Sequence, residues 1–142
     1  MSGEERTLAI IKPDVVGREL AGKIITRIEE SGFEIVGMKM LKLSEKLAGE
    51  FYAVHKGKPF YEELVDFMTS DRCIVMVLQA QGAILKWREL IGATNFEKAK
   101  EGTIRKEFAT SVQRNACHGS DAPETARQEI SFFFSGSELI CC

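Results

Sequence analysis

The chain has 142 residues, of which 44% are hydrophobic and 28% charged, and its formal net charge is −2. These values are typical of one globular domain, here residues 1–142, and no apolar run is long enough to cross a membrane. A slightly acidic chain lacks the basic surface that nucleic-acid binding requires, so we expect no nucleic-acid partner. Any anion site must therefore be a local basic pocket.

The cysteines and the two ends of the chain bear on its compartment. The first residues, Met1–Arg6, contain no apolar core of a signal peptide. Four cysteines, none in a Cys-x-x-Cys pair, are expected to be reduced thiols, which predicts a cytoplasmic protein. Cys141 and Cys142 follow no basic segment, which favours an exposed, oxidisable tail over a prenylation signal.

Hydrophobic periodicity predicts, in order, a buried strand at 7–11 that stops at Pro13, a helix from about Leu20 to Gly32, a strand at 33–43, a short helix that Ser44 caps and another that Pro59 opens. The second half is predicted as an apolar strand at 73–78, a helix at 82–90, a mostly irregular stretch at 92–113, a brief strand at 115–117 and a last helix from Asp121 to the phenylalanines at 132–134. Glu124 stands three residues after Asp121, as in a capping box.

This order reduces to βαββαβ if the extra short helices are decorations. It predicts an α+β fold, a ferredoxin-like sandwich in which helices pack on a four-stranded antiparallel sheet. A long insertion loop at about 92–114 fits a compact domain only if the loop is functional.

One segment nearly matches a phosphate-binding P-loop, namely 17–24, Gly-Arg-Glu-Leu-Ala-Gly-Lys-Ile. Ile24 stands where a Ser or Thr hydroxyl must hold Mg²⁺, and Gln79 ends the third strand where an Asp would coordinate the metal. Because the helical spacing already begins at Leu20, little loop is left to wrap phosphates. We therefore interpret this segment as the start of a helix.

The stretch 114–121, Arg-Asn-Ala-Cys-His-Gly-Ser-Asp, holds one of the two histidines ahead of the last helix. Backbone N–H groups and the helix dipole favour a phosphate at such a position. His118 is thus a candidate for taking up and handing on a phosphoryl group. A lone histidine is more often a surface or packing residue, so this alternative stays open at the level of the motif.

Basic residues at separate positions suggest a phosphate clamp. Lys12 follows the first strand, Arg88 lies on the helix after the third strand, and Arg105 lies in the long loop near Thr94. Arg114 precedes the histidine segment. Each of these residues alone is interpretable as a solvated charge. Together with His118 they match a triphosphate site, because one guanidinium group can donate two hydrogen bonds to the oxygens of a phosphate.

Four segments closely resemble the nucleoside diphosphate kinase family: 7–14 (TLAIIKPD), 92–95 (GATN), 102–105 (GTIR) and 115–121 (NACHGSD). The resemblance extends from about residue 6 to 134, and the length is similar to that of the compact bacterial members. It implies the ferredoxin-like fold, a homo-oligomer (a tetramer or hexamer built from dimers), and transfer of the γ-phosphate of a nucleoside triphosphate, mainly ATP, to a nucleoside diphosphate. The transfer is a ping-pong reaction through phosphohistidine, with Nδ1 of His118 as the nucleophile, and it maintains the nucleotide pools.

The resemblance also implies the roles of the surrounding residues. Glu129 orients the imidazole, with Gly119 and Ser120 as its support. The other roles are implied in groups: Lys12 and Tyr52 stabilise the transferred phosphoryl group, Arg88, Thr94 and Arg105 hold the other phosphates, Asn115 with Lys12 contacts the sugar, and Phe60 and Val112 enclose the base. Mg²⁺ is expected on the nucleotide phosphates, with Asp121 reaching it through water. For Phe60 packing in the core against Leu64 remains an alternative.

A few positions depart from the family pattern or fall outside it. The departures are Asp71-Arg72, Phe96, Lys106-Glu107 and Ala122. His55 is predicted to be solvent-exposed, and Cys117 to point to the opposite face of its strand from His118. A non-catalytic nucleotide-sensing domain on the same fold is the alternative function.

Overall fold

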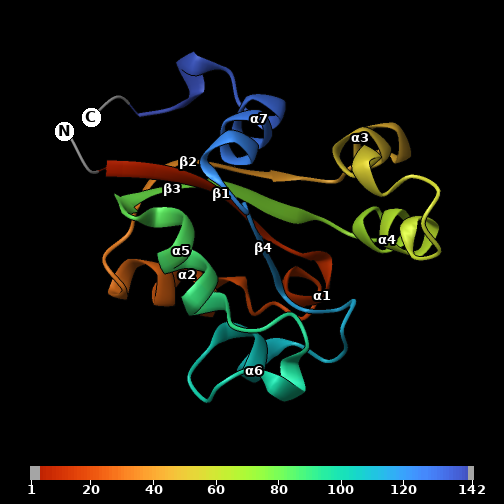
Figure 1. The fold of residues 1–142 in the computed structure, drawn as a ribbon, viewed down its shortest axis with the longest axis horizontal. Coiled ribbons are helices and arrows are strands. Elements are labelled where there is room, and N and C mark those ends of the chain that lie inside the picture. The colour runs from red at the N-terminus through yellow and green to blue at the C-terminus, as the bar shows by residue number, and fades with distance from the viewer. Residues whose placement is uncertain (1–3, 141–142) are drawn as a thin grey trace.

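The computed structural model describes residues 4–140, in which four antiparallel strands form one sheet in the order β2-β3-β1-β4 (Figure 1). The strands are β1 (Glu4–Ile11), β2 (Glu34–Leu41), β3 (Cys73–Gln81) and β4 (Cys117–Gly119). The apolar β1 and β3 pair along their whole length at the centre, from Glu4 with Gln81 to Ile11 with Ile74. This topology confirms the predicted α+β ferredoxin-like fold. The Cys141-Cys142 tail lies outside the described residues.

The helices are α1 (Pro13–Val16), α2 (Ala21–Glu30), α3 (Glu45–Phe51), α4 (Tyr61–Met68), α5 (Ala83–Ile91), α6 (Ile104–Phe108) and α7 (Pro123–Phe133). Helices α2 and α5 cover one face of the sheet and α7 the other, while α3 and α4 form a separate pair beside it (Figure 1). No helix in residues 4–140 is long and apolar enough to span a membrane.

The alternating side chains of β1 supply both cores of the molecule. Ala9 and Ile11 face α2 and α5, where Trp87 is fully buried, whereas Leu8 and Ile10 face α3, α4 and α7. Because successive side chains of a strand point to opposite faces, one strand buried on both sides joins the two helical layers. The strand to which β4 pairs is therefore among the most firmly held elements of the fold.

Three predicted boundaries were wrong, each for a local reason. The fourth strand begins at Cys117 rather than 115, because Ala116 adopts a positive φ of 76° that interrupts an extended strand. The last helix begins at Pro123 rather than Asp121, since proline favours the first helical position, and Thr125 rather than Glu124 accepts a hydrogen bond from the capping residue, Ala122. The helix expected to open at Pro59 begins at Tyr61.

The long loop is also more regular than predicted. It contains a short 3₁₀ turn, Phe96–Lys98, and helix α6, whose first turn is capped by the Thr103 hydroxyl accepting from the Lys106 N–H. Five residues of helix are too few to produce a recognisable hydrophobic period, so the sequence pattern missed it. An ion pair of 2.9 Å between Glu107 and Arg27 joins this loop to α2, so one departure from the family pattern has a partner here.

The C-terminal segment returns to the edge of the sheet. The Ile140 N–H donates to the carbonyl of Val36, where β2 is irregular in its pairing with β3. Leu139 packs so closely on Gly37 that a Cβ there would lie 2.7 Å from its side chain. The segment 139–140 is thus docked on β2.

Helix α5 takes its N-terminal cap from another element. Gly82, at the capping position, has no side chain, and the Ile84 N–H instead donates to Glu5 Oε1 of β1 at 2.9 Å. A carboxylate at this end also interacts favourably with the helix dipole. Glu5 therefore ties α5 to β1.

We predict that Glu5→Ala lowers the free energy of unfolding by about 1 kcal/mol, the usual value of a helix cap. Glu5→Gln keeps an acceptor oxygen and loses only the charge, so it should cost less. Urea unfolding of both variants, with Glu4→Ala as the exposed control, measures this. Equal stability of Glu5→Ala and Glu4→Ala would show that the cap contributes nothing.

Candidate active site

An open cleft of about 660 Å³ lies where β1 ends and β4 begins, between the α3–α4 pair, α5 and the long loop. Apart from Arg114, Ser120 and Glu129, every sequence-predicted site residue lines it: Lys12, Tyr52, Phe60, Arg88, Thr94, Arg105, Val112, Asn115, His118, Gly119 and Asp121. Ser120 and Glu129 lie behind His118. Residues that are more than a hundred positions apart in the sequence thus share one wall. Arg114 differs, since its guanidinium lies over the ring of Phe67.

A chain of hydrogen bonds fixes the imidazole of His118. Its Nε2 lies 3.0 Å from Glu129 Oε1, and the Ser120 hydroxyl donates to the same carboxylate oxygen at 2.8 Å. The Leu8 N–H of β1 donates to the Ser120 hydroxyl in turn. Because a carboxylate accepts, Nε2 carries the proton, and Nδ1 keeps its lone pair. This arrangement leaves Nδ1 as the ring nitrogen that can act as a nucleophile.

The backbone and ring of His118 are held by packing as well. The Trp87 indole N–H donates to the His118 carbonyl at 3.0 Å, and Gly119 lies so close to that indole that a Cβ would be 2.7 Å from it. Only glycine permits this approach of β4 to α5. On the other side, Phe51 meets the imidazole edge to face, with ring centroids 5.6 Å apart. The sequence analysis assigned no role to Phe51.

Lys12 is a buried cation at the centre of the cleft. Its Nζ donates to Asn115 Oδ1 at 2.9 Å, and the Asn115 amide donates to the Val112 carbonyl. Burial, and then the positive charge of Arg105, lower the pKa of Lys12 to about 8, against the opposing effect of Asp14 and Cys117. The ammonium is therefore charged at neutral pH and poorly solvated, which strengthens its attraction for an anion.

Arg105 ties the long loop to the segment that carries His118. Its guanidinium donates to the carbonyls of Asn115, Gly92 and Cys117 at 3.2, 3.0 and 2.9 Å. A further contact of 3.5 Å reaches the Thr94 hydroxyl. Burial lowers the pKa of Arg105, although an arginine stays charged. The long loop thus brings a second cation to the cleft, which is the kind of contribution expected of a long loop in a compact domain.

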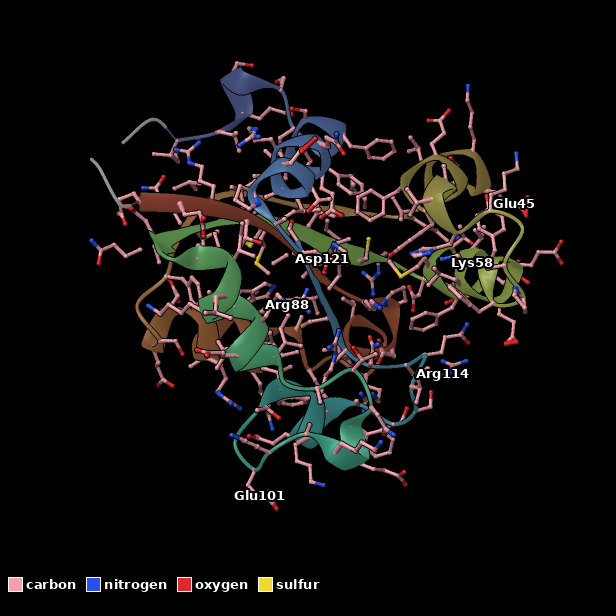
Figure 2. All side chains as sticks on the ribbon, viewed as in Figure 1. Glu45, Lys58, Arg88, Glu101, Arg114 and Asp121 are labelled. Atoms are coloured by element: carbon pink, nitrogen blue, oxygen red, sulfur yellow. The ribbon has the colours of Figure 1, made fainter. Side chains whose placement is uncertain are left out.

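The outer end of the cleft carries a paired charge. Arg88, on α5, forms an ion pair with Asp121, just before α7 (Figure 2). Both side chains are substantially exposed, so the pair adds little stability, and either group is free to rearrange toward a ligand. No group of three or more His, Cys, Asp or Glu side chains able to hold a metal occurs within residues 4–140.

The Tyr52 hydroxyl is buried at the inner wall without a hydrogen-bond partner in the described part of the chain. Burial, then the nearby Cys73 and Glu129, raise its pKa, so it is a neutral donor. Buried polar groups normally have partners, so this hydroxyl is available to a ligand.

The mouth of the cleft is apolar. Phe60 is 46% exposed and Val112 56% exposed, so core packing does not account for Phe60. His55 was wrongly predicted to be solvent-exposed: its side chain is half-buried, its ring lies 5.2 Å from Phe60, and its Nδ1 is buried without a partner among residues 4–140. The 3₁₀ turn Ala53–His55 directs it into the cleft, and its position between two aromatic candidates was the signal available in the sequence.

Cys117 lies in the core beneath Trp87, on the opposite face from His118 as predicted. Burial raises the pKa of its thiol to about 12, so it is not a nucleophile at neutral pH.

Comparison with known proteins agrees with this geometry. The family model described as nucleoside diphosphate kinase matches residues 5–139. The nucleoside diphosphate kinases of Syntrophotalea carbinolica and Paracoccus denitrificans are 60% and 59% identical to the chain over 136 residues, which is 96% of this chain and 99% and 97% of theirs. The structure of the Aquifex aeolicus nucleoside diphosphate kinase superposes with a TM-score of 0.94 at 44% identity, covering 96% of this chain and 99% of that one. A halophilic nucleoside diphosphate kinase from Halobacterium salinarum, in complex with CDP, gives 0.94 at 40% identity, with coverages of 98% and 93%.

Proposed function

Because this chain belongs to the nucleoside diphosphate kinase family, and so transfers phosphate between nucleotides, we propose that the γ-phosphate of a nucleoside triphosphate, mainly ATP, passes through Nδ1 of His118. The observation that carries this proposal is the Ser120–Glu129–His118 chain, which occupies Nε2 and leaves the Nδ1 lone pair free. In the first half-reaction Nδ1 forms a bond to the γ-phosphorus, the bond from the γ-phosphorus to the β,γ-bridging oxygen breaks, and the nucleoside diphosphate leaves. In the second, an acceptor diphosphate takes the phosphoryl group.

The positive and neutral donors around Nδ1 have complementary roles in this scheme. Lys12 and the Tyr52 hydroxyl stabilise the negative charge on the transferred phosphoryl group, which is greatest in the transition state. Arg88, Thr94 and Arg105 hold the remaining phosphates, and His55, whose Nδ1 has no partner among residues 4–140, also lines the cleft. Positioning and electrostatics supply most of the catalysis in such reactions, which agrees with a site built chiefly of fixed donors.

The apolar mouth would hold the base, and Asn115 with Lys12 the sugar hydroxyls. Phe60 offers an aromatic face for stacking and Val112 an aliphatic contact on the other side. Stacking is tolerant of base identity because every base has a π-face. This supports transfer among all common nucleoside di- and triphosphates rather than a single one.

Magnesium fits this site as a companion of the phosphates. The exposed carboxylate of Asp121 is the oxygen ligand available at the outer end of the cleft, and Mg²⁺ is usually held by phosphates, waters and one or two carboxylates. Bound there, the ion would neutralise charge on the phosphates, with Asp121 reaching it through water.

We also propose that the protein is a cytoplasmic homo-oligomer, a tetramer or hexamer built from dimers. Met38 and Met40 are 54% and 52% exposed on β2, which is an edge strand. Exposed apolar side chains on an edge strand are typical of a self-association surface. Cys73 and Cys117 are free, buried thiols, as expected in a reducing compartment.

Incubation with γ-labelled ATP and Mg²⁺ should label the protein with phosphate that survives alkali and is lost in acid. Label should pass to added GDP, and His118→Asn should take up none while keeping the fold. Glu129→Gln, which weakens the orienting bond, should slow labelling by about 10- to 100-fold. Nucleotide binding without labelling would instead support the sensing alternative.

Nucleotide affinity should fall by about tenfold as the pH rises through 8, because Lys12 then loses the proton that it needs to bind a phosphate. A bound phosphate favours the ammonium, so binding at pH 9 should take up a proton. Titration calorimetry of ADP in two buffers of different ionisation enthalpy measures this uptake. Lys12→Arg, whose charge persists, is the control, and an affinity independent of pH between 7 and 9.5 would contradict the assignment.

Met40→Glu should dissociate or shrink the oligomer, because it places a charge in the proposed apolar contact. Sedimentation velocity at micromolar concentration compares it with Val54→Glu, a charge at a side chain that is 80% exposed near the cleft. An unchanged sedimentation coefficient for Met40→Glu would remove β2 from the interface.

A further inference from the structure

The segment between the long loop and β4 contains an unusual backbone conformation. Ala116, which is fully buried, has a φ of 76°, in the left-handed region that L-residues other than glycine seldom adopt. It stands between Asn115, a Lys12 partner, and the strand that carries His118. Such conformations persist only where the surroundings hold them.

Three hydrogen bonds to the segment 12–14, which follows β1, hold this turn. The Lys12 N–H donates to the Ala116 carbonyl at 2.8 Å, the Ala116 N–H donates to Asp14 Oδ2 at 3.2 Å, and Lys12 Nζ donates to Asn115 Oδ1. Both peptide groups of Ala116 are therefore occupied by the segment 12–14. Among these partners, Asp14 supplies the only acceptor side chain for a backbone N–H.

The burial of Asp14 at this position opposes folding. It is only 9% exposed, and its Oδ1 is buried without a hydrogen-bond partner in the described residues. Burial of a carboxylate oxygen without a partner opposes folding. Asp14 does not line the cleft, so contact with substrate does not explain it.

We propose that Asp14 is a positioning residue, which holds the left-handed turn at Ala116 and thereby sets the places of Asn115, Lys12 and His118 relative to the bound phosphates. This inference rests on the proposed function, since it concerns the same cleft. It assigns to Asp14 a role in the geometry of the reaction rather than in contact with the nucleotide.

The negative charge of Asp14 also affects the protonation of Lys12. Lys12 and Arg18 are the cations that face it, and Lys12 in turn faces Arg105 and Cys117. The carboxylate raises the pKa of Lys12, against burial and Arg105, which lower it. Burial raises the pKa of Asp14 itself, and the two cations and the Ala116 N–H oppose this. A neutral residue at position 14 should therefore allow Lys12 to lose its proton at a lower pH.

Two variants separate geometry from charge. Asp14→Ala removes the acceptor, and we expect kcat to fall by about 100-fold with a smaller change in KM, as for a small misplacement of reacting groups. Asp14→Asn keeps a carbonyl oxygen for the Ala116 N–H, so kcat at pH 7 should stay within about tenfold of the wild-type value. Its alkaline limb should move to lower pH. Asp66→Asn, on the exposed face of α4, is the matched control for the loss of one charge.

A second-site change tests the turn directly. Glycine adopts positive φ without support, so adding Ala116→Gly to Asp14→Ala should restore about tenfold in kcat relative to Asp14→Ala alone. Ala116→Gly in the wild-type background is the reference for the effect of the lost methyl group. A purely structural role of Asp14 would lower stability without this specific rescue.

The outcomes are distinct. A kcat for Asp14→Ala within threefold of wild type overturns the proposal, as does a loss that merely follows the folded fraction measured by circular dichroism, or a loss that Ala116→Gly does not relieve. The labelling of wild-type protein tests His118 separately. Unlabelled wild type counts against the phosphohistidine, whereas labelled wild type with an unimpaired Asp14→Ala counts against Asp14 alone.

Discussion

The pairing of β4 with the end of β1 is the constraint on which the site depends. Only three register pairs form it, Ala9 with Gly119, Ile10 with His118 and Ile11 with Cys117. They place His118 beside a strand that is buried on both faces, which restricts the movement of the His118 main chain. Trp87 and Arg105 donate to the carbonyls of His118 and Cys117 within this short strand. The imidazole is held through Glu129 and Ser120, and Ser120 in turn accepts from Leu8 of β1. A three-residue strand, weak by itself, is thus fixed from several directions.

The same arrangement gathers positive charge in a chain whose net charge is negative. Lys12 is buried and Arg105 half-buried beside the cleft, and their mutual repulsion and desolvation oppose the folded state. Carbonyl groups and the single carboxylate of Asp14 offset part of this cost. A phosphate bound there, as proposed above, would relieve both effects at once.

The fold class followed from the sequence because it depends on long runs with clear periods, such as the apolar strand at 73–78. Specific motifs also indicated the residues that the structure brings around one cleft, and Lys12 and His118 are near in space although 106 positions apart. The sequence did not predict features that leave no periodic signal. These are the left-handed Ala116, because of which the fourth strand begins two residues later than predicted, the five-residue helix α6, and the orientation of His55 into the cleft. Each is decided by tertiary contacts or by single dihedral angles, which neighbouring residue types do not encode.

The docked C-terminal segment has a consequence for how the sheet can grow. The carbonyl of Val36 already accepts from Ile140, and Leu139 covers Gly37. A strand from another molecule that approached this edge would find the beginning of β2 occupied, and would have to pair beyond the bulge, where Met38 and Met40 are exposed. Residues 139–140 therefore limit which registers of edge-to-edge pairing are open, and this limit opposes indefinite lateral extension of the sheet.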